Sequence, residues 1–76
     1  MTHLNKLQPG QKGKIIGFTD DNRISRRLLE LGVVPGRDIK HVRNAPLNDP
    51  MEIQVGPCCL SLRHAEASMV TIELDD

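Results

Sequence analysis

Aromatic side chains are almost absent from this 76-residue chain, which has one phenylalanine and neither tryptophan nor tyrosine. Grooves that bind proline-rich peptides are lined with aromatic side chains, and proteins that hold single-stranded nucleic acid usually stack its bases on them. The single aromatic residue, Phe18, therefore argues against both kinds of binding module. The net charge of zero argues further against binding to nucleic acid.

Cysteine is also scarce, since the only two cysteines are the adjacent Cys58 and Cys59. Neighbouring residues of a strand point to opposite faces, and a disulfide between them would be strained, so neither a disulfide framework nor a shared metal is expected. We expect two reduced thiols, as in a cytosolic protein. No apolar run approaches the ~20 residues that span a bilayer, and residues 1–6 lack an apolar export segment, so no direct membrane insertion is expected.

Charge is unevenly distributed along the sequence. Residues 1–43 contain nine of the ten lysines and arginines with four acids, a balance of +5, whereas residues 44–76 contain one arginine and six acids, a balance of −5. A small barrel interleaves its two sequence halves, which favours a mixed, solvated surface. The alternative is a basic helical face that binds an acidic partner.

Hydrophobic alternation predicts five short strands, at residues 13–18, 37–44, 51–55, 58–62 and 70–74. Ile39 and Val42 have opposite parity in the second of these, so a β-bulge is expected there. In the fourth, Cys58 has the parity of a small core residue and Cys59 faces outwards. Two prolines make residues 45–50 a rigid connector between strands.

A helix is predicted from about Arg23 to Leu31, in the long loop after the first strand. The polar residues 19–22 before it offer several N-caps, and Gly32 after it can adopt the positive φ of a helix C-terminus. Pro35-Gly36 then supplies a tight turn into the next strand.

One face of this helix is predicted to be buried. Ile24, Leu28 and Leu31 stand at positions i, i+4 and i+7, which places them on a single apolar stripe. Leu29 lies off that stripe, so it is either covered by a loop or left as an apolar contact point.

Together these elements predict a mainly β domain, residues 1–76, folded as a small SH3-like barrel of five strands. A short α-helix lies in the loop after the first strand, and residues 63–67 form one helical turn before the last. The alternative is an open five-stranded sheet with a helix packed across it.

Three spaced motifs lie between residues 28 and 67: Leu28-x-x-Leu31-Gly32-Val33-x-Pro35-Gly36, Ala45-Pro46-Leu47-x-Asp49-Pro50, and Leu60-Ser61-Leu62-Arg63 followed by Glu66-Ala67. In this order they resemble the FeoA family of small ferrous-iron transport accessory proteins. The resemblance implies an SH3-like barrel that acts in the cytoplasm with FeoB, an inner-membrane permease bearing a GTP-binding domain. It does not imply catalysis. His41 stands where the family tends to carry an apolar residue.

The implied link to iron transport raises the question of whether the chain carries metal ligands. The candidates form neither a C-x-x-C nor an H-x-x-x-H pattern, which would bring two ligands to one side of an element. They are His3, His41, His64, Cys58, Cys59, Asp20, Asp21, Glu52 and Glu66. We expect solvent-facing histidines, no cofactor, and at most weak binding of Fe2+ or another divalent metal. An Fe(II)-sensing or Fe(II)-delivering module is the alternative function.

Catalytic motifs are missing as well, since no Gly-rich phosphate loop, nucleophile motif or suitably spaced carboxylate pair occurs. GTP hydrolysis would then belong to the partner. The sequence therefore favours a non-enzymatic accessory or regulatory protein of ferrous-iron uptake that binds the permease. Its oligomeric state is not predicted.

The best candidate for a partner-binding surface surrounds the predicted helix and the turn after it. An apolar centre with arginines on its margin is typical of protein contact sites. Either Val33 or Val34 is also expected to close the end of the barrel. The predicted partner-binding residues are Arg23, Arg26, Arg27, Leu29, Val33, Val34 and Pro35.

Overall fold

The computed structural model describes residues 1–75, which form one six-stranded antiparallel sheet with two short α-helices and two 3-10 turns. Along the chain the elements are β1 (Thr2–His3), η1 (Leu4–Lys6), β2 (Lys12–Phe18), α1 (Arg23–Leu31), β3 (Asp38–Asn44), η2 (Pro46–Asn48), β4 (Met51–Val55), β5 (Cys58–Leu62), α2 (His64–Ala67) and β6 (Val70–Leu74). The predicted mainly β architecture is confirmed, and β1 is a strand that the sequence did not predict.

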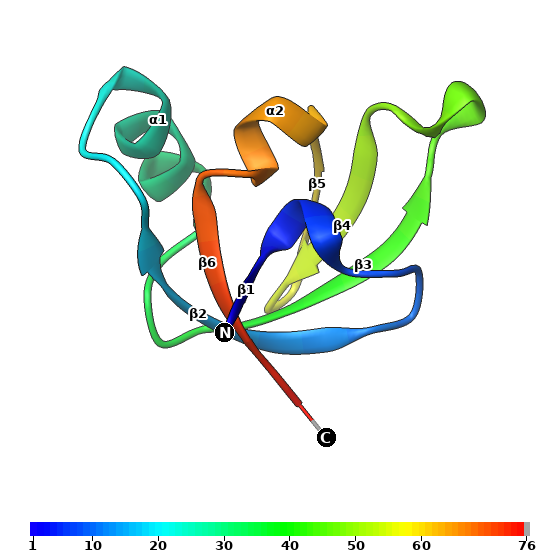
Figure 1. Ribbon diagram of the computed structural model, residues 1–76, viewed down its shortest axis with the longest axis horizontal. Helices are drawn as coiled ribbons and strands as arrows, with labels where there is room; N and C mark the ends of the chain where they lie inside the picture. The colour runs from blue at the N-terminus through cyan, green and yellow to red at the C-terminus, as the bar shows by residue number, and fades with distance from the viewer. Residues whose placement is uncertain (76) are drawn as a thin grey trace.

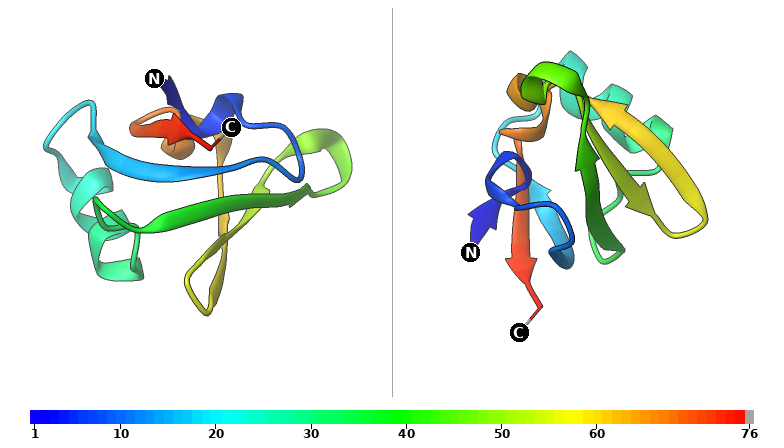
Figure 2. Two further views of the ribbon diagram at one scale, coloured as in Figure 1. Left: turned by 90° about the horizontal axis from the view of Figure 1, so that it is seen from below. Right: turned by 90° about the vertical axis from the view of Figure 1, so that its right-hand side faces the viewer.

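The strands are hydrogen-bonded in the order β1-β6-β2-β3-β4-β5, so β1 and β5 are the two edges. The sheet curls on itself, as Figure 1 and Figure 2 show. Both α-helices and the η2 turn lie at one end of the molecule, and the end of β6 lies at the other. We call the first of these the helical end.

Helix α1 begins and ends where its capping residues dictate. The Asn22 side chain accepts hydrogen bonds from the backbone N–H groups of Ile24 (2.9 Å) and Ser25 (3.1 Å). The Ser25 hydroxyl in turn accepts the Asn22 N–H at 2.9 Å, which completes a capping box. At the other end, Gly32 has a φ of 107°, a conformation that glycine adopts without steric cost.

The core is a single cluster of aliphatic side chains from both helices, η1 and the strands. Gly13 shows how closely the strands approach around it, because an added Cβ would lie 2.5 Å from the carbonyl oxygen of Glu73. Only glycine fits at this point of the contact between β2 and β6. The core residues are Leu4, Leu7, Ile15, Leu28, Val33, Ile39, Met51, Ile53, Val55, Leu62, Ala67, Val70 and Ile72.

The predicted buried stripe on α1 is wrong at both of its ends. Leu28 is completely buried, but Ile24 is 39% exposed and Leu31 is 41% exposed. Ser25, a polar residue, is buried instead. Ser25 and Leu28, three positions apart, are the buried residues of this nine-residue helix, so its face towards the core is shorter than the predicted stripe.

Cys58 is exposed, which corrects the prediction that it is a core residue. Strand β5 pairs with β4 alone, and the pair Val55 and Cys58 lies at the turn end of this hairpin. The alternation of side chains along β5 is therefore as predicted, but no element covers the strand at this point. Cys59 is exposed as predicted.

His41 is buried, which corrects the prediction that the histidines face solvent. Its Nδ1 atom lies 2.8 Å from the carbonyl oxygen of Leu7, and its Nε2 atom lies 3.0 Å from Oδ1 of Asn44. The predicted bulge is present, because the β3–β4 register shifts between His41 and Arg43. The bulge leaves Val42 40% exposed and directs the imidazole inwards, where it connects β3 to the end of η1.

We expect Leu28→Ala to lower the free energy of unfolding by about 2–5 kcal/mol, because it opens a cavity that the surrounding barrel cannot close. Leu29→Ala is the matched control on the same helix and should cost about 1 kcal/mol or less, since this side chain is partly exposed. Urea unfolding followed by circular dichroism measures both. Equal losses for the two variants would contradict this assignment of the core.

Candidate partner-binding site

The surface between α1 and the end of β2 contains the predicted apolar centre. Leu29 is 41% exposed there, and Pro35 is exposed beside it. Both residues line a hollow of about 360 Å³ together with Phe18 and the carboxylates Asp20 and Asp21, among others. Leu29 is thus not covered by a loop, and the one aromatic residue of the chain contributes to the same surface.

Val33 does not belong to this surface, which corrects its prediction as a partner-binding residue. It is completely buried in the core, and Val34 is half-buried. The Val33 N–H donates to the carbonyl oxygen of Leu28 at 2.9 Å, directly after the left-handed Gly32 has reversed the chain. This reversal turns Val33 inwards, so it is the valine that closes the end of the barrel.

The three predicted arginines are exposed on α1. Arg26 Nε lies 3.5 Å from Oδ1 of Asp21, and Arg27 Nη1 lies 3.6 Å from Oε2 of Glu66. Exposed ion pairs of this kind stabilise a fold by only about 0.2–1 kcal/mol, so a partner can replace them at little cost. The margin of the surface is therefore mixed in charge, with arginines on the helix and carboxylates beside it.

A network of charged groups links α1 to α2 and to the connector that contains η2. Oδ1 of Asp49 accepts a hydrogen bond from the backbone N–H of His64 and lies 3.0 Å from its Nδ1. Oδ2 of Asp49 lies 3.5 Å from Nη1 of Arg63, whose own backbone N–H donates to Glu66 at 3.0 Å. Glu66 then pairs with Arg27 of α1. Hydrogen bonding to His64 is the main reason that the pKa of Asp49 is lowered.

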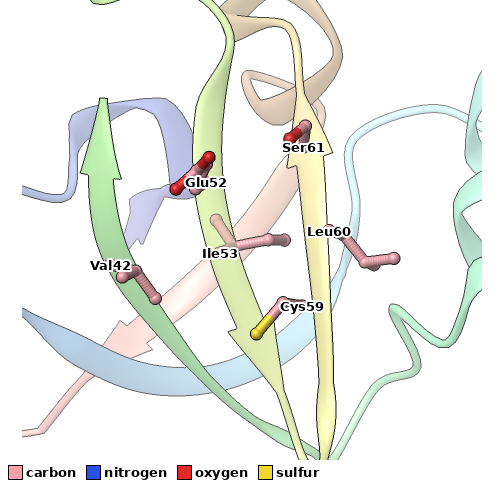
Figure 3. Close-up of a pocket in the computed structure, with 6 residues that line it drawn as sticks. All are labelled: Val42, Glu52, Ile53, Cys59, Leu60 and Ser61. Carbon is pink, nitrogen blue, oxygen red and sulfur yellow. The ribbon is translucent and has the colours of Figure 1, made fainter. Parts of the chain in front are cut away.

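A second, smaller hollow of about 160 Å³ lies on the outer face of β3, β4 and β5, and Figure 3 shows its lining. Cross-strand pairing places Glu52 opposite Ser61 on this face. A hydrogen-bonded ion pair with Arg43 lowers the pKa of Glu52. The sequence did not predict this hollow, because it depends on the register between three strands. Its lining residues are Val42, Glu52, Ile53, Cys59, Leu60 and Ser61.

The candidate metal ligands are dispersed over the fold. Within residues 1–75, no three His, Cys, Asp or Glu side chains gather into a group that could hold a metal ion. His3 lies in β1, and His41 and His64 each have hydrogen-bond partners within the fold. Over the same described residues, no helix is both long enough and apolar enough to cross a membrane.

A curled antiparallel sheet of short strands, with a short helix in the loop after β2, defines a small SH3-like domain. A model of the FeoA domain matches residues 2–74. The chain therefore belongs to the FeoA family, and the family resemblance of its three motifs is confirmed.

Three relatives illustrate the family. The chain is 32% identical over 71 residues to a Porphyromonas gingivalis fusion of Fe(2+) transport protein A with the Fe(2+) transporter FeoB, and the match spans 93% of this chain but 8% of the fusion protein. It is 27% identical over 71 residues to a Campylobacter jejuni protein named as an Fe(2+) transport protein A, spanning 93% of this chain and 96% of that one. The FeoA crystal structure from Stenotrophomonas maltophilia, complexed with zinc and described as an SH3 domain protein, has a TM-score of 0.85 and 30% identity over 96% of this chain and 91% of that one. The predicted SH3-like fold and the association of the family with Fe2+ transport are confirmed.

The hydrogen bonds of Asp49 predict an acid-sensitive contribution to stability. Because its folded-state pKa lies below the unfolded value, this contribution is complete above the unfolded pKa and is lost as the pH falls through the folded pKa. Between about pH 5 and pH 2, the melting temperature of Asp49→Asn should therefore fall less steeply than that of the wild type. Asp75→Asn is the control for the loss of one negative charge. If the melting temperatures of Asp49→Asn and the wild type fell equally steeply as the pH is lowered, the prediction would be refuted.

Proposed function

We propose that this chain is a non-enzymatic accessory or regulatory protein of ferrous-iron uptake, and that it acts in the cytoplasm by binding a FeoB-like membrane permease with a GTP-binding domain. The observation that carries the proposal is the exposed surface around Leu29 and Pro35, with arginines on its margin, in a chain of the FeoA family. The relative in which the two proteins are fused supports the choice of partner.

The fusion also indicates how strong the contact has to be. Joining two binding partners in one chain gives them a high effective concentration, about millimolar for short flexible linkers, so a weak contact is sufficient. A surface of modest area with one apolar centre and exchangeable ion pairs fits such a contact. In a separate chain the same surface would give transient binding, which suits a regulatory protein.

Recognition rather than catalysis is the proposed activity. The chain has no sequence motif for binding phosphates, so GTP hydrolysis is assigned to the permease. The buried histidine, His41, connects β3 to η1 through hydrogen bonds to Leu7 and Asn44, which accounts for it as a structural residue.

Leu29→Glu should weaken binding to the soluble GTP-binding domain of the cognate permease while the fold stays cooperative, because a charge replaces the apolar centre of the surface. The matched control is Leu74→Glu. Leu74 is 42% exposed against 41% for Leu29, but it lies at the end of β6, away from the helical end. Calorimetric titration measures the affinity, and thermal unfolding checks both variants. We expect a loss of about tenfold or more for Leu29→Glu only.

Two outcomes would contradict the proposal. If Leu29→Glu unfolds whereas Leu74→Glu does not, Leu29 is a core residue and the surface is wrongly assigned. If the folded Leu29→Glu variant binds as well as the wild type, the permease contacts another part of the chain. Amide chemical shifts of the labelled protein during the titration would then locate that part.

We further propose that the chain holds no resident metal ion and does not itself carry Fe(II). The dispersion of the His, Cys and acidic side chains within residues 1–75 supports this proposal. An anaerobic Fe(II) titration should therefore give no stoichiometric binding at sub-micromolar metal. Stoichiometric binding that His64→Ala or Cys59→Ser abolishes would favour the alternative function, sensing or delivery of Fe(II).

A further inference from the structure

Leu47, in the turn η2, combines two unfavourable features. Its side chain is 97% exposed, more than any other large hydrophobic side chain of the described residues. Its backbone also has a left-handed conformation, with φ of 72° and ψ of 13°. Branched apolar residues rarely adopt this conformation, which costs roughly 1–2 kcal/mol for a residue with a Cβ atom.

The turn itself does not require a leucine. Glycine would adopt the same backbone angles without steric cost, and asparagine, which occupies position 48 with φ of 64°, tolerates them better than leucine. Within the domain, the Leu47 side chain buries almost no surface that could offset the strain. Strain of this kind is typical of functional positions.

Hydrogen bonds hold the connector around Leu47 in place. The Asn48 N–H donates to the carbonyl oxygen of Ala45 at 2.8 Å, and the Ala45 N–H donates to that of Pro50 at 2.9 Å. Asp49, next in the chain, is bound to His64 and Arg63 of the charged network. The leucine is therefore presented on an ordered turn, which reduces the entropy that a partner must remove on binding.

The position of this turn connects it to the proposed partner-binding surface. Figure 1 and the left-hand view of Figure 2 show α1 and η2 on opposite sides of the helical end, and Figure 1 shows α2 between them. The charged network runs from Asp49 beside η2, through Glu66 of α2, to Arg27 of α1. The same end of the molecule thus carries both Leu29 and Leu47, on elements that are linked only through α2 and the charged network.

We propose that Leu47 is a second apolar anchor for the permease, inserted into an apolar pocket on the cytoplasmic part of that protein. This inference rests on the proposed function. The permease is the chosen occupant because Leu47 shares the helical end with the proposed contact surface, and because a relative has the two proteins in one chain. Once one anchor has bound the permease, the other is held near its own site at a high effective concentration. Each anchor therefore increases the affinity that the other provides.

The test uses the full chain and the soluble GTP-binding domain of the cognate permease. Leu47→Gly and Leu47→Asn remove the anchor and relieve the left-handed strain, so both should have melting temperatures equal to or above that of the wild type. Their affinity for the permease domain should nevertheless fall by about tenfold. Leu47→Met keeps an apolar side chain at the same backbone angles and should retain affinity within about threefold.

The possible results separate this inference from the proposed function. If Leu47→Gly binds like the wild type while Leu29→Glu does not, Leu47 is no anchor and the proposed function stands. If the wild type itself does not bind the permease domain, both fail. Self-association by light scattering that Leu47→Gly abolishes would assign the anchor to a second copy of this chain and overturn the permease as its occupant. A lowered melting temperature for both Leu47→Gly and Leu47→Asn would show that the leucine stabilises the turn, which also overturns the inference.

Discussion

The left-handed backbone at Gly32 is the constraint on which the attachment of α1 depends. It lets the chain reverse within one residue, so the Gly32 and Val33 N–H groups bond back to the last turn of the helix. Leu28 before the reversal and Val33 after it both enter the core as a result, and Leu29 lies outside it. A residue with a Cβ atom would be strained at this φ. If the chain changed direction less sharply after the helix, different side chains would be buried. The same glycine thus determines the packing of the helix and the composition of the proposed contact surface.

Exposed apolar side chains on α1 follow in part from the size of the domain. A chain of this length buries only about 60% of its unfolded surface, so a short helix has apolar residues at the borders of its buried face. Ile24 and Leu31 are such residues, and their exposure alone indicates no function. Leu29 differs because it lines a hollow with Phe18 and Pro35, beside exchangeable ion pairs. Leu47 differs more strongly, because its backbone has a strained left-handed conformation and its apolar side chain is almost fully exposed to solvent.

Local patterns predicted most of the fold, since capping residues and alternation depend only on nearby sequence. The bounds of α1 agree with the prediction because Asn22 and Gly32 stand at its two ends, and the bulge of β3 agrees because its parity break is visible in the sequence. Burial was less predictable, because it depends on neighbours distant in the chain. The exposure of Cys58 requires knowledge that β5 is an edge strand, and the burial of His41 requires the register of the bulge. Strand β1 has two residues, too few to show alternation.

The size of the molecule limits how the proposed contact can work. A standard interface buries about 800 Å² on each partner, which is about one sixth of the 4832 Å² surface of this domain. One such interface would therefore leave about five sixths of the surface of this domain, whose radius of gyration is 10.9 Å, in contact with solvent. Affinity at an interface of fixed area depends on the quality and pre-organisation of its anchors rather than on further area. The η2 turn is pre-organised by its own backbone hydrogen bonds and by the bonds of Asp49 to His64, whereas the exposed Arg27–Glu66 pair adds only a weak link between α2 and α1.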